Sequence, residues 1–255
     1  LAGLSHFYYS NTVVKTFLRN LKNETMERWE NQVAVITGAS SGIGGAIAKY
    51  LANNKMVTVN LDMNIEGYQA QLAELSPDLV KRMHCIKCNV REEFEIKAAF
   101  IEIEKNFGPV SVMVNNVGMM TKTKLLTENN SEDMVKMLET NVLAAIYCTR
   151  EAFRSMKANG IDGHVFLMNC VCGHKVPLMP NNVMSLYPPT KFAITALTEM
   201  YRQEFWDQKT KVKITSISPG ITTTAIAKDV DVPPHTAALK PNDVADALIY
   251  CLQTP

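Results

Sequence analysis

The sequence predicts an α/β protein whose doubly wound parallel sheet is covered by helices on both faces. Two observations carry this prediction. Short apolar runs of strand length alternate along the chain with longer segments in which apolar residues recur every three or four positions. The first apolar run is joined to the first helical segment by a glycine-rich octet, T-G-A-S-S-G-I-G, at residues 37–44. Strands that alternate with helices pair in parallel, because each helix crosses over the sheet between two strands.

The periodicity of apolar residues places each element. The first strand is Val33–Ile36, and the helix after the octet repeats Ile43, Ile47 and Leu51 at intervals of four. Further strands are expected at 56–61, 83–90, 110–114, 164–169 and 212–218, and further helices at 65–75, 92–106, 131–157, 187–207 and 242–252.

Two of the helix starts have local sequence support. Ser131 is the expected cap of the long helix 131–157, followed by Glu132 and Asp133 in its first turn. Two prolines follow Tyr187. Proline is tolerated in the first turn of a helix, where the backbone N–H groups have no partner within the helix.

Composition limits the class of protein. The chain has 255 residues, 47% of them hydrophobic, so we expect 26–255 to form a single domain, with 1–25 as an N-terminal extension outside the fold. The 26 basic and 25 acidic side chains leave a net charge of +1, which argues against a nucleic-acid partner. No apolar run reaches the roughly 20 residues of a membrane span. The six cysteines show no secretory spacing and predict reduced thiols in a cytoplasmic location.

The octet predicts a phosphate-binding turn. Its glycines, Gly38, Gly42 and Gly44, follow the spacing G-x-x-x-G-x-G between a strand and a helix. Glycine lets the backbone turn tightly and approach a ligand closely. The helix that starts here presents unpaired N–H groups and the positive end of its dipole to an anion such as a pyrophosphate. Because no Lys-Ser/Thr follows Gly44, the motif is not a P-loop, and a dinucleotide cofactor is predicted.

Asp62 ends the second strand, 18 positions after Gly44. An acidic residue about 20 residues after the glycines typically binds the ribose 2′-hydroxyl of a dinucleotide. A carboxylate there repels a 2′-phosphate, and no Arg or Lys stands beside Gly42 or directly after Asp62. The sequence therefore favours NAD(H), with NADP(H) as the alternative. The competing interpretation is that Asp62 is only a solvated turn residue.

Neither cysteine pair predicts a metal site. Cys85 and Cys88 fall in the expected strand 83–90, where side chains three apart point to opposite faces of the sheet. Cys170 and Cys172 lack the second half of a zinc site. We therefore expect no bound metal.

Three polar residues stand out on helices. Asn141 lies on the apolar face of the helix 131–157, and a buried Asn must have hydrogen-bond partners. It either joins two elements or holds a water or side chain at a site. Tyr187 and Lys191 are four positions apart and share one helix face.

These features resemble the short-chain dehydrogenase/reductase family. The octet, Asp62, Asn141, Tyr187-x-x-x-Lys191, the sequence N-N-V-G at 115–118 and Pro-Gly at 219–220 occur in the family's order. The resemblance covers the chain from Glu27 to its end and implies a Rossmann-like three-layer α/β/α sandwich. The stretches N-V-L-A-A-I-Y-C-T-R-E-A and K-P-N-D-V-A-D-A-L-I-Y resemble the branch with insect farnesol dehydrogenases and a vertebrate ketosteroid-reducing relative.

The resemblance also implies roles for individual residues. Tyr187 exchanges the proton with the substrate oxygen, and Lys191 binds the nicotinamide ribose and, with the cofactor's charge, lowers the tyrosine pKa. Asn141 holds a water of the proton relay. The implied cofactor contacts are Gly38, Ser40, Ser41, Gly42, Ile43, Gly44, Asp62, Asn89, Val90, Asn116, Tyr187, Lys191, Pro219, Gly220, Ile221, Thr222 and Thr224.

The chain departs from the family pattern at several points. Cys170 stands where the family has its catalytic serine, Val117 replaces the alanine of N-N-A-G, and Asn89 replaces an aspartate beside the adenine. The family usually has one more strand after the last helix, whereas this chain ends at Pro255. The branch is also associated with NADP(H), against the preference that Asp62 predicts.

Two functional hypotheses follow. The first is an oxidoreductase that transfers a hydride between the nicotinamide cofactor and an apolar alcohol or carbonyl compound, isoprenoid-, retinoid- or steroid-like. Four methionines near the expected site suit such a substrate, although plain packing explains them equally well: Met119, Met120, Met179 and Met184. The second is a cofactor-binding pseudoenzyme with weak or no turnover, because of Cys170. Relatives commonly pair through the helices 131–157 and 187–207, so we expect a homodimer or homotetramer.

Overall fold

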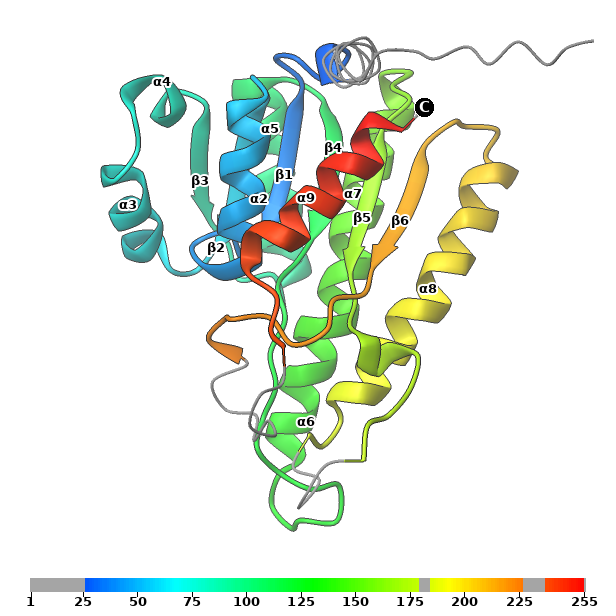
Figure 1. Ribbon diagram of the computed structural model, residues 1–255. Helices are drawn as coiled ribbons and strands as arrows, with labels where there is room; N and C mark the ends of the chain where they lie inside the picture. The colour runs from blue at the N-terminus through cyan, green and yellow to red at the C-terminus, as the bar shows by residue number, and fades with distance from the viewer. Residues whose placement is uncertain (1–25, 179–183, 227–236, 255) are drawn as a thin grey trace, which may run out of the picture.

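The computed structural model describes residues 26–178, 184–226 and 237–254. Six strands form one sheet in the order β3-β2-β1-β4-β5-β6, and every pair of neighbours is parallel (Figure 1). The strands are β1 (Val33–Thr37), β2 (Val57–Asp62), β3 (Met83–Lys87), β4 (Val110–Asn115), β5 (His164–Met168) and β6 (Lys213–Ile217). The chain winds outward from β1 to β3 and then returns to build β4 to β6 on the other side, as a doubly wound sheet does. The predicted fold class is confirmed.

Helices cover both faces of this sheet (Figure 1). One face carries α2 (Gly42–Asn53), α3 (Ile65–Ala73), α4 (Pro77–Val80) and α9 (Pro241–Gln253). The other carries α5 (Glu93–Phe107), α7 (Ala144–Ala158) and α8 (Tyr187–Asp207). Two further segments, α6 (Ser131–Leu138) and the π-helical turn η1 (Glu139–Leu143), lead directly into α7.

The hydrophobic core has one layer on each side of the sheet. Every residue of β1, β4 and β5 is buried, as expected for central parallel strands. On one face Leu51 of α2 packs in the same cluster as Leu248 of α9. On the other face Phe100 of α5 shares a cluster with Met156 of α7. The burial of each such side chain contributes about 1.5–3 kcal/mol to the free energy of unfolding. The well-packed core makes the ends of the strands a rigid platform.

Two predicted element boundaries are wrong. The strand expected at 83–90 ends at Lys87, so Cys88 follows the strand instead of lying within it. The helix expected at 65–75 ends at Ala73, and a separate short helix begins at Pro77. Proline disfavours helical backbone at the residue before it, and Ser76 before Pro77 is accordingly extended. The extended residue separates the two helices, and Pro77 is tolerated because it lies in the first turn of the second.

The long helix expected at 131–157 is interrupted by the π-helical turn η1. Its N-cap is Asn130, whose side chain makes no capping hydrogen bond, so the prediction of Ser131 as the cap is wrong. The acidic first turn, Glu132 and Asp133, is confirmed. Single π turns inside helices often mark functional sites, and this one contains Asn141.

All six strands point toward the same edge of the sheet, where α6 and several loops lie (Figure 1). The strand order reverses between β1 and β4, and ligands of such sheets bind outside the carboxyl ends of the strands at this point. Within the described part of the chain, no helix has both the length and the apolar character needed to cross a bilayer. Residues 1–25 lie outside the described ranges, so the domain boundary at Met26 stays a prediction.

Candidate active site

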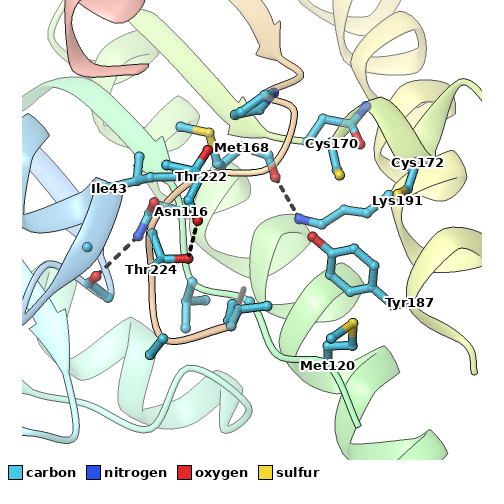
Figure 2. A pocket seen from close by; sticks show the side chains of 18 of the residues that line it. Ile43, Asn116, Met120, Met168, Cys170, Cys172, Tyr187, Lys191, Thr222 and Thr224 are labelled. Carbon is cyan, nitrogen blue, oxygen red and sulfur yellow. Dashed lines mark hydrogen bonds between the residues drawn. The ribbon is translucent and has the colours of Figure 1, made fainter. Parts of the chain in front are cut away.

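A cavity of about 420 Å³ opens at the carboxyl edge of the sheet (Figure 2). Most of the residues predicted from the sequence line it: Gly38, Ser41, Gly42, Ile43, Asp62, Asn116, Cys170, Tyr187, Lys191, Pro219, Gly220, Ile221, Thr222 and Thr224. We call the part beside the glycine turn (residues 37–44) and Asp62 the glycine-turn end, and the part formed by Cys170, Cys172, Tyr187 and Lys191 the thiol end. The segment 219–226 borders the cavity along both ends.

The glycine turn needs its glycines for geometric reasons. Gly38 and Gly42 have φ values of +71° and +57°, a backbone conformation that side chains disfavour. A Cβ on Gly44 would lie 2.5 Å from both Asn116 Nδ2 and the Gly38 carbonyl oxygen. Ser41 is the N-cap of α2 but makes no side-chain capping bond. The first turn of α2 therefore offers N–H groups to an anion in the cavity.

Thr37 and Asn116 tie the glycine turn to the end of β4. The Thr37 hydroxyl accepts hydrogen bonds from the backbone N–H groups of Asn116 and Val117, both at 3.0 Å. In return, Asn116 Nδ2 donates to the carbonyl oxygens of Thr37 and Gly38 at 2.9 and 3.1 Å. These reciprocal bonds fix the two loops at the point where the strand order reverses.

Asp62 lines the cavity and also braces the glycine turn. Its Oδ2 accepts from the Ser40 backbone N–H at 3.1 Å, and its Oδ1 accepts from the Asn64 N–H at 3.0 Å. A carboxylate oxygen has further acceptor capacity, so the group can still accept from a ligand hydroxyl. Among the described residues that line the cavity, Asp62 is the one carboxylate and Lys191 the one cation.

Five predicted residues do not line the cavity: Ser40, Gly44, Asn89, Val90 and Asn141. Ser40 and Gly44 act through the turn itself, as described above. Asn89 and Val90 follow β3, where the Asn89 backbone N–H donates to Glu95 Oε2 at 2.7 Å. Their contacts with the adenine stay predictions.

Asn141 joins two elements through its side chain. Its Oδ1 accepts from the Met119 N–H at 2.8 Å, while its Nδ2 donates to the Met119 carbonyl oxygen at 2.9 Å and to the Thr190 hydroxyl at 3.1 Å. Both N–H donors of the amide are therefore used within the protein. Of the two roles considered for this residue, the structure supports the joining of elements. The water of the proton relay stays a prediction.

Tyr187 and Lys191 lie together at the thiol end, on the first turns of α8 (Figure 2). Lys191 is buried, and its Nζ donates to the Met168 carbonyl oxygen at 2.8 Å. Burial lowers the pKa of Lys191 to about 8, against the opposing effect of the Cys170 and Cys172 charges. Burial has the opposite effect on Tyr187, because the charged form of tyrosine is the deprotonated one, so it raises the pKa of Tyr187. The neighbouring Cys170 also raises the Tyr187 pKa. The protein's own groups thus do not produce the lowered tyrosine pKa that the family resemblance implies.

Cys170 lies at the N-cap of the short 3₁₀ turn η2 (Val171–Gly173). Gly173 lets this turn pack on α8, because a Cβ there would lie 2.6 Å from the Lys191 carbonyl oxygen. The pKa of Cys170 is lowered to about 6. The largest cause is the Cys172 thiol; the Cys172 backbone N–H, the Lys191 charge and the Tyr187 hydroxyl act in the same direction, and burial opposes them. The neighbours of Cys170 therefore favour its thiolate form.

The sequence assigned no role to several residues that line or support the cavity. Thr37 anchors the β4 loop, and Met168 supplies the carbonyl that holds Lys191. Asn169, Ala225 and Ile226 also line the cavity. Their positions in the sequence could have indicated them, because each lies at the end of a predicted strand or in or beside a predicted motif. Met179, one of the four methionines considered, lies outside the described residues, whereas Met120 and Met184 line the cavity.

Sequence comparisons match this arrangement. A family model described as short chain dehydrogenase matches residues 32–233. Farnesol dehydrogenase of Aedes aegypti is 41% identical over 230 residues, which cover 90% of this chain and 93% of that protein. Dehydrogenase/reductase SDR family member 11 of Mus musculus is 38% identical over 241 residues, which cover 90% and 92%.

Solved structures share the fold. An alcohol dehydrogenase from Thermococcus sibiricus, complexed with 5-hydroxy-NADP, superposes with a TM-score of 0.75 at 25% identity and covers 88% of this chain and 91% of that chain. The 3-ketoacyl-(acyl-carrier-protein) reductase of Brucella melitensis, complexed with NADH, has a TM-score of 0.77 at 22% identity and covers 89% and 94%. The family predicted from the motifs is confirmed: this chain belongs to the short-chain dehydrogenase/reductase family of oxidoreductases, in the branch of farnesol dehydrogenase and SDR family member 11.

Proposed function

We propose that the protein transfers a hydride between NAD(H) and an apolar alcohol or carbonyl compound of isoprenoid, retinoid or steroid type. The observation that carries this proposal is the shared cavity. It places an anion-binding turn and a carboxylate at one end, and a tyrosine and a buried lysine at the other. The nicotinamide cofactor supplies the hydride chemistry when bound, and the protein orients it and moves the proton.

The glycine-turn end fits the phosphate and adenosine part of such a cofactor. The first turn of α2 would hold the pyrophosphate, since its N–H groups are uncapped and glycine leaves space for a close approach. Asp62 would accept from the adenosine ribose hydroxyls. The segment Pro219–Thr224 would cover the nicotinamide, beside Asn116.

Asp62 favours NAD(H) over NADP(H). Its carboxylate lies in the cavity wall, and no cation among the described lining residues stands near it to bind a 2′-phosphate. The carboxylate accepts from the backbone N–H groups of Ser40 and Asn64, and neither of these donors is a cation. A 2′-phosphate would meet the negative charge of the carboxylate directly.

The thiol end fits proton exchange with a substrate oxygen. Tyr187 would donate its proton in carbonyl reduction and accept one in alcohol oxidation. Lys191 uses one of its three N–H donors on Met168, which leaves two for ribose hydroxyls. The cavity wall nearby is apolar, with the side chains of Met120, Met168 and Met184, and suits a substrate with a hydrocarbon body.

The experiment is a fluorescence titration with NADH and NADPH, followed by a turnover screen of apolar alcohols and ketones. We expect NADH to bind at least tenfold more tightly, which corresponds to about 1.4 kcal/mol. Turnover should appear with a long apolar alcohol and fall to background in Tyr187→Phe. Equal or inverted dissociation constants would contradict the cofactor assignment, and no turnover with any apolar substrate would contradict the substrate class.

A second candidate function is a cofactor-binding pseudoenzyme. One observation favours it: Cys170 lies with Tyr187 at the thiol end of the cavity, and its charge, after burial, raises the pKa of Tyr187, which opposes proton transfer. In that case NADH, NADPH or both would still bind. The wild type, Cys170→Ser and Tyr187→Phe would all turn over substrate at the same background rate.

We also propose a homodimer or homotetramer in a cytoplasmic, thiol-reducing compartment. All six cysteines are free thiols. The helices expected to pair expose large apolar side chains: Val135, Leu138, Phe192, Met200 and Trp206. Light scattering at micromolar concentration should give a multiple of 28.4 kDa. A monomeric mass would count against the assembly.

A further inference from the structure

Cys170 and Cys172 form a fixed pair in the wall of the cavity (Figure 2). Three hydrogen bonds hold the turn that carries them. The Val171 N–H donates to the Pro219 carbonyl oxygen at 3.1 Å, the Gly173 N–H to the Cys170 carbonyl oxygen at 2.8 Å, and the Thr195 hydroxyl to the Gly173 carbonyl oxygen at 2.9 Å. One residue in a 3₁₀ turn separates the two cysteines, so their Cα atoms fall in the range of about 4.4 to 6.8 Å that a disulfide spans.

Several groups that lower the pKa of Cys170 lie with it at the thiol end of the cavity (Figure 2). The thiol of Cys172 lowers this pKa most, and the Cys172 backbone N–H, the Lys191 charge and the Tyr187 hydroxyl lower it as well, against the effect of burial. Both cysteines line the cavity, and Cys170 is partly exposed whereas Cys172 is buried. An accessible sulfur that is activated by donors and a cation, with a second thiol at its side, is the arrangement found in redox-sensitive cysteines.

We propose that Cys170 and Cys172 are a hydroperoxide-reactive thiol pair, in which Cys170 is oxidised first and Cys172 resolves it as a disulfide. The pair is distinct from the hydride transfer proposed above, since it needs neither the nicotinamide cofactor nor the alcohol. Its reactant is a hydroperoxide, ROOH, either hydrogen peroxide or an apolar organic hydroperoxide that enters the methionine-lined cavity.

The two steps balance as follows. The Cys170 thiolate attacks the terminal oxygen of ROOH; an S–O bond forms, the O–O bond breaks, and the leaving alkoxide takes a proton from solvent to give ROH. Cys172 then attacks the sulfenic sulfur; an S–S bond forms, the S–O bond breaks, and hydroxide leaves with the Cys172 proton as water. The two sulfurs lose two electrons and the peroxide gains them. A dithiol reductant reverses the change by thiol–disulfide exchange.

The other partly exposed cysteines are matched controls in the same molecule. Cys85 and Cys251 resemble Cys170 in exposure. Burial raises the pKa of Cys85 to about 11 and also raises the pKa of Cys251, so both are neutral thiols at pH 7. The proposal therefore predicts that Cys170 reacts selectively, at least tenfold faster than either control, because the thiolate is the reactive form.

The test uses the full chain, reduced with dithiothreitol and then freed of it. Protein at pH 7 is treated with hydrogen peroxide or, in a parallel arm, with cumene hydroperoxide, then alkylated with N-ethylmaleimide and digested for mass spectrometry. The peptide with Cys170 and Cys172 should lose two hydrogen atoms and take up no maleimide, and dithiothreitol should reverse both changes. A faster reaction in the cumene arm would assign the reactant to apolar hydroperoxides, and a faster reaction in the other arm to hydrogen peroxide.

Two variants separate the roles of the thiols. In Cys172→Ser, Cys170 should stop at the sulfenic acid and add dimedone. In Cys170→Ser, Cys172 should stay reduced, with circular dichroism confirming that the variant is folded. The proposal is overturned if Cys170 reacts no faster than Cys85 and Cys251, or if the wild type proceeds to a sulfinic acid or an intermolecular disulfide while Cys172 keeps its thiol.

Discussion

The two ends of the cavity are built by different means. At the glycine-turn end, backbone geometry does the positioning: positive φ at Gly38 and Gly42, and reciprocal bonds between Thr37 and Asn116. At the thiol end, the environment of the side chains sets the chemistry. Burial displaces the pKa values of Tyr187 and Lys191, and the Cys172 thiol displaces that of Cys170. A turn defined by glycine spacing can be recognised in a sequence, whereas a displaced pKa exists only after the chain has folded.

The largest expected effect is at the thiol end. Tyr187→Phe removes the hydroxyl proposed to exchange the proton, so kcat/KM with an apolar alcohol should fall by about 10² to 10⁴. The dissociation constant of NADH should change less than twofold, since the glycine-turn end is untouched. The matched control is Tyr201→Phe on the same helix, whose hydroxyl is not part of the cavity. Comparable losses in both variants would show that the effect is structural.

Cys170→Ser should raise kcat/KM of the wild type tenfold or more. A serine hydroxyl donates a hydrogen bond, whereas a thiol is a weak donor and a thiolate donates none. A donor aimed at developing charge is worth roughly 10² to 10³ in rate, of which Tyr187 already supplies part. The variant also removes the anion that raises the Tyr187 pKa. Because alcohol oxidation needs deprotonated Tyr187, the rise of its rate with pH should move to lower pH.

The control for this prediction is Cys172→Ser, which leaves the Cys170 sulfur in place. If Cys170→Ser gains nothing and stays at the Tyr187→Phe background, the protein is better described as a pseudoenzyme. If the wild type is already fast, another donor serves the substrate oxygen. Ser185 is one candidate for this donor, since its buried hydroxyl has no hydrogen-bond partner among the described residues.

This difference between the ends also decides how much the sequence could predict. The six strands, the octet and the start of α8 at Tyr187 were recognisable, because each depends on local periodicity or spacing. The π-helical turn was not, because Asn141 is held there by Met119 and Thr190, which are 22 and 49 residues away. The lowered pKa of Cys170 was not predictable either, since it depends on the position of the Cys172 thiol in the folded turn and on Lys191 and Tyr187 packing beside it.

At the glycine-turn end, Asp62→Asn should reduce the preference for NADH by about tenfold. Asparagine keeps an oxygen that can accept from backbone N–H groups but removes the charge that repels a 2′-phosphate. NADPH affinity should therefore rise while NADH affinity changes little. Glu66→Gln, an exposed acid in the first turn of α3, is the control for the loss of one negative charge. An unchanged preference in Asp62→Asn would mean that Asp62 does not face the ribose.

The smallest effect is expected at the start of β5, the strand that precedes the thiols. His164 begins β5, buried, with its Nε2 2.8 Å from the Thr215 hydroxyl and its ring stacked on Phe166. Burial, with smaller effects of the Lys213 and Arg28 charges, lowers the pKa of His164 to about 3. His164 is at the amino end of β5, whereas the cavity lies at the carboxyl ends of the strands. A substitution of His164 should therefore affect stability and leave catalysis unchanged.

The sign of the pH effect follows from the direction of this shift. Between pH 6.5 and about pH 3 the unfolded chain binds a proton at His164 and the folded chain does not, so the free energy of unfolding falls as pH falls through this window, by at most about 1.4 kcal/mol per pH unit. His164→Gln can keep the bond to Thr215 and has no titrating group. Urea unfolding at pH 7 and pH 5 should therefore show a smaller loss of stability in the variant, with kcat/KM at pH 7 within twofold of wild type. Parallel losses in the two proteins would show that His164 is not the group that titrates.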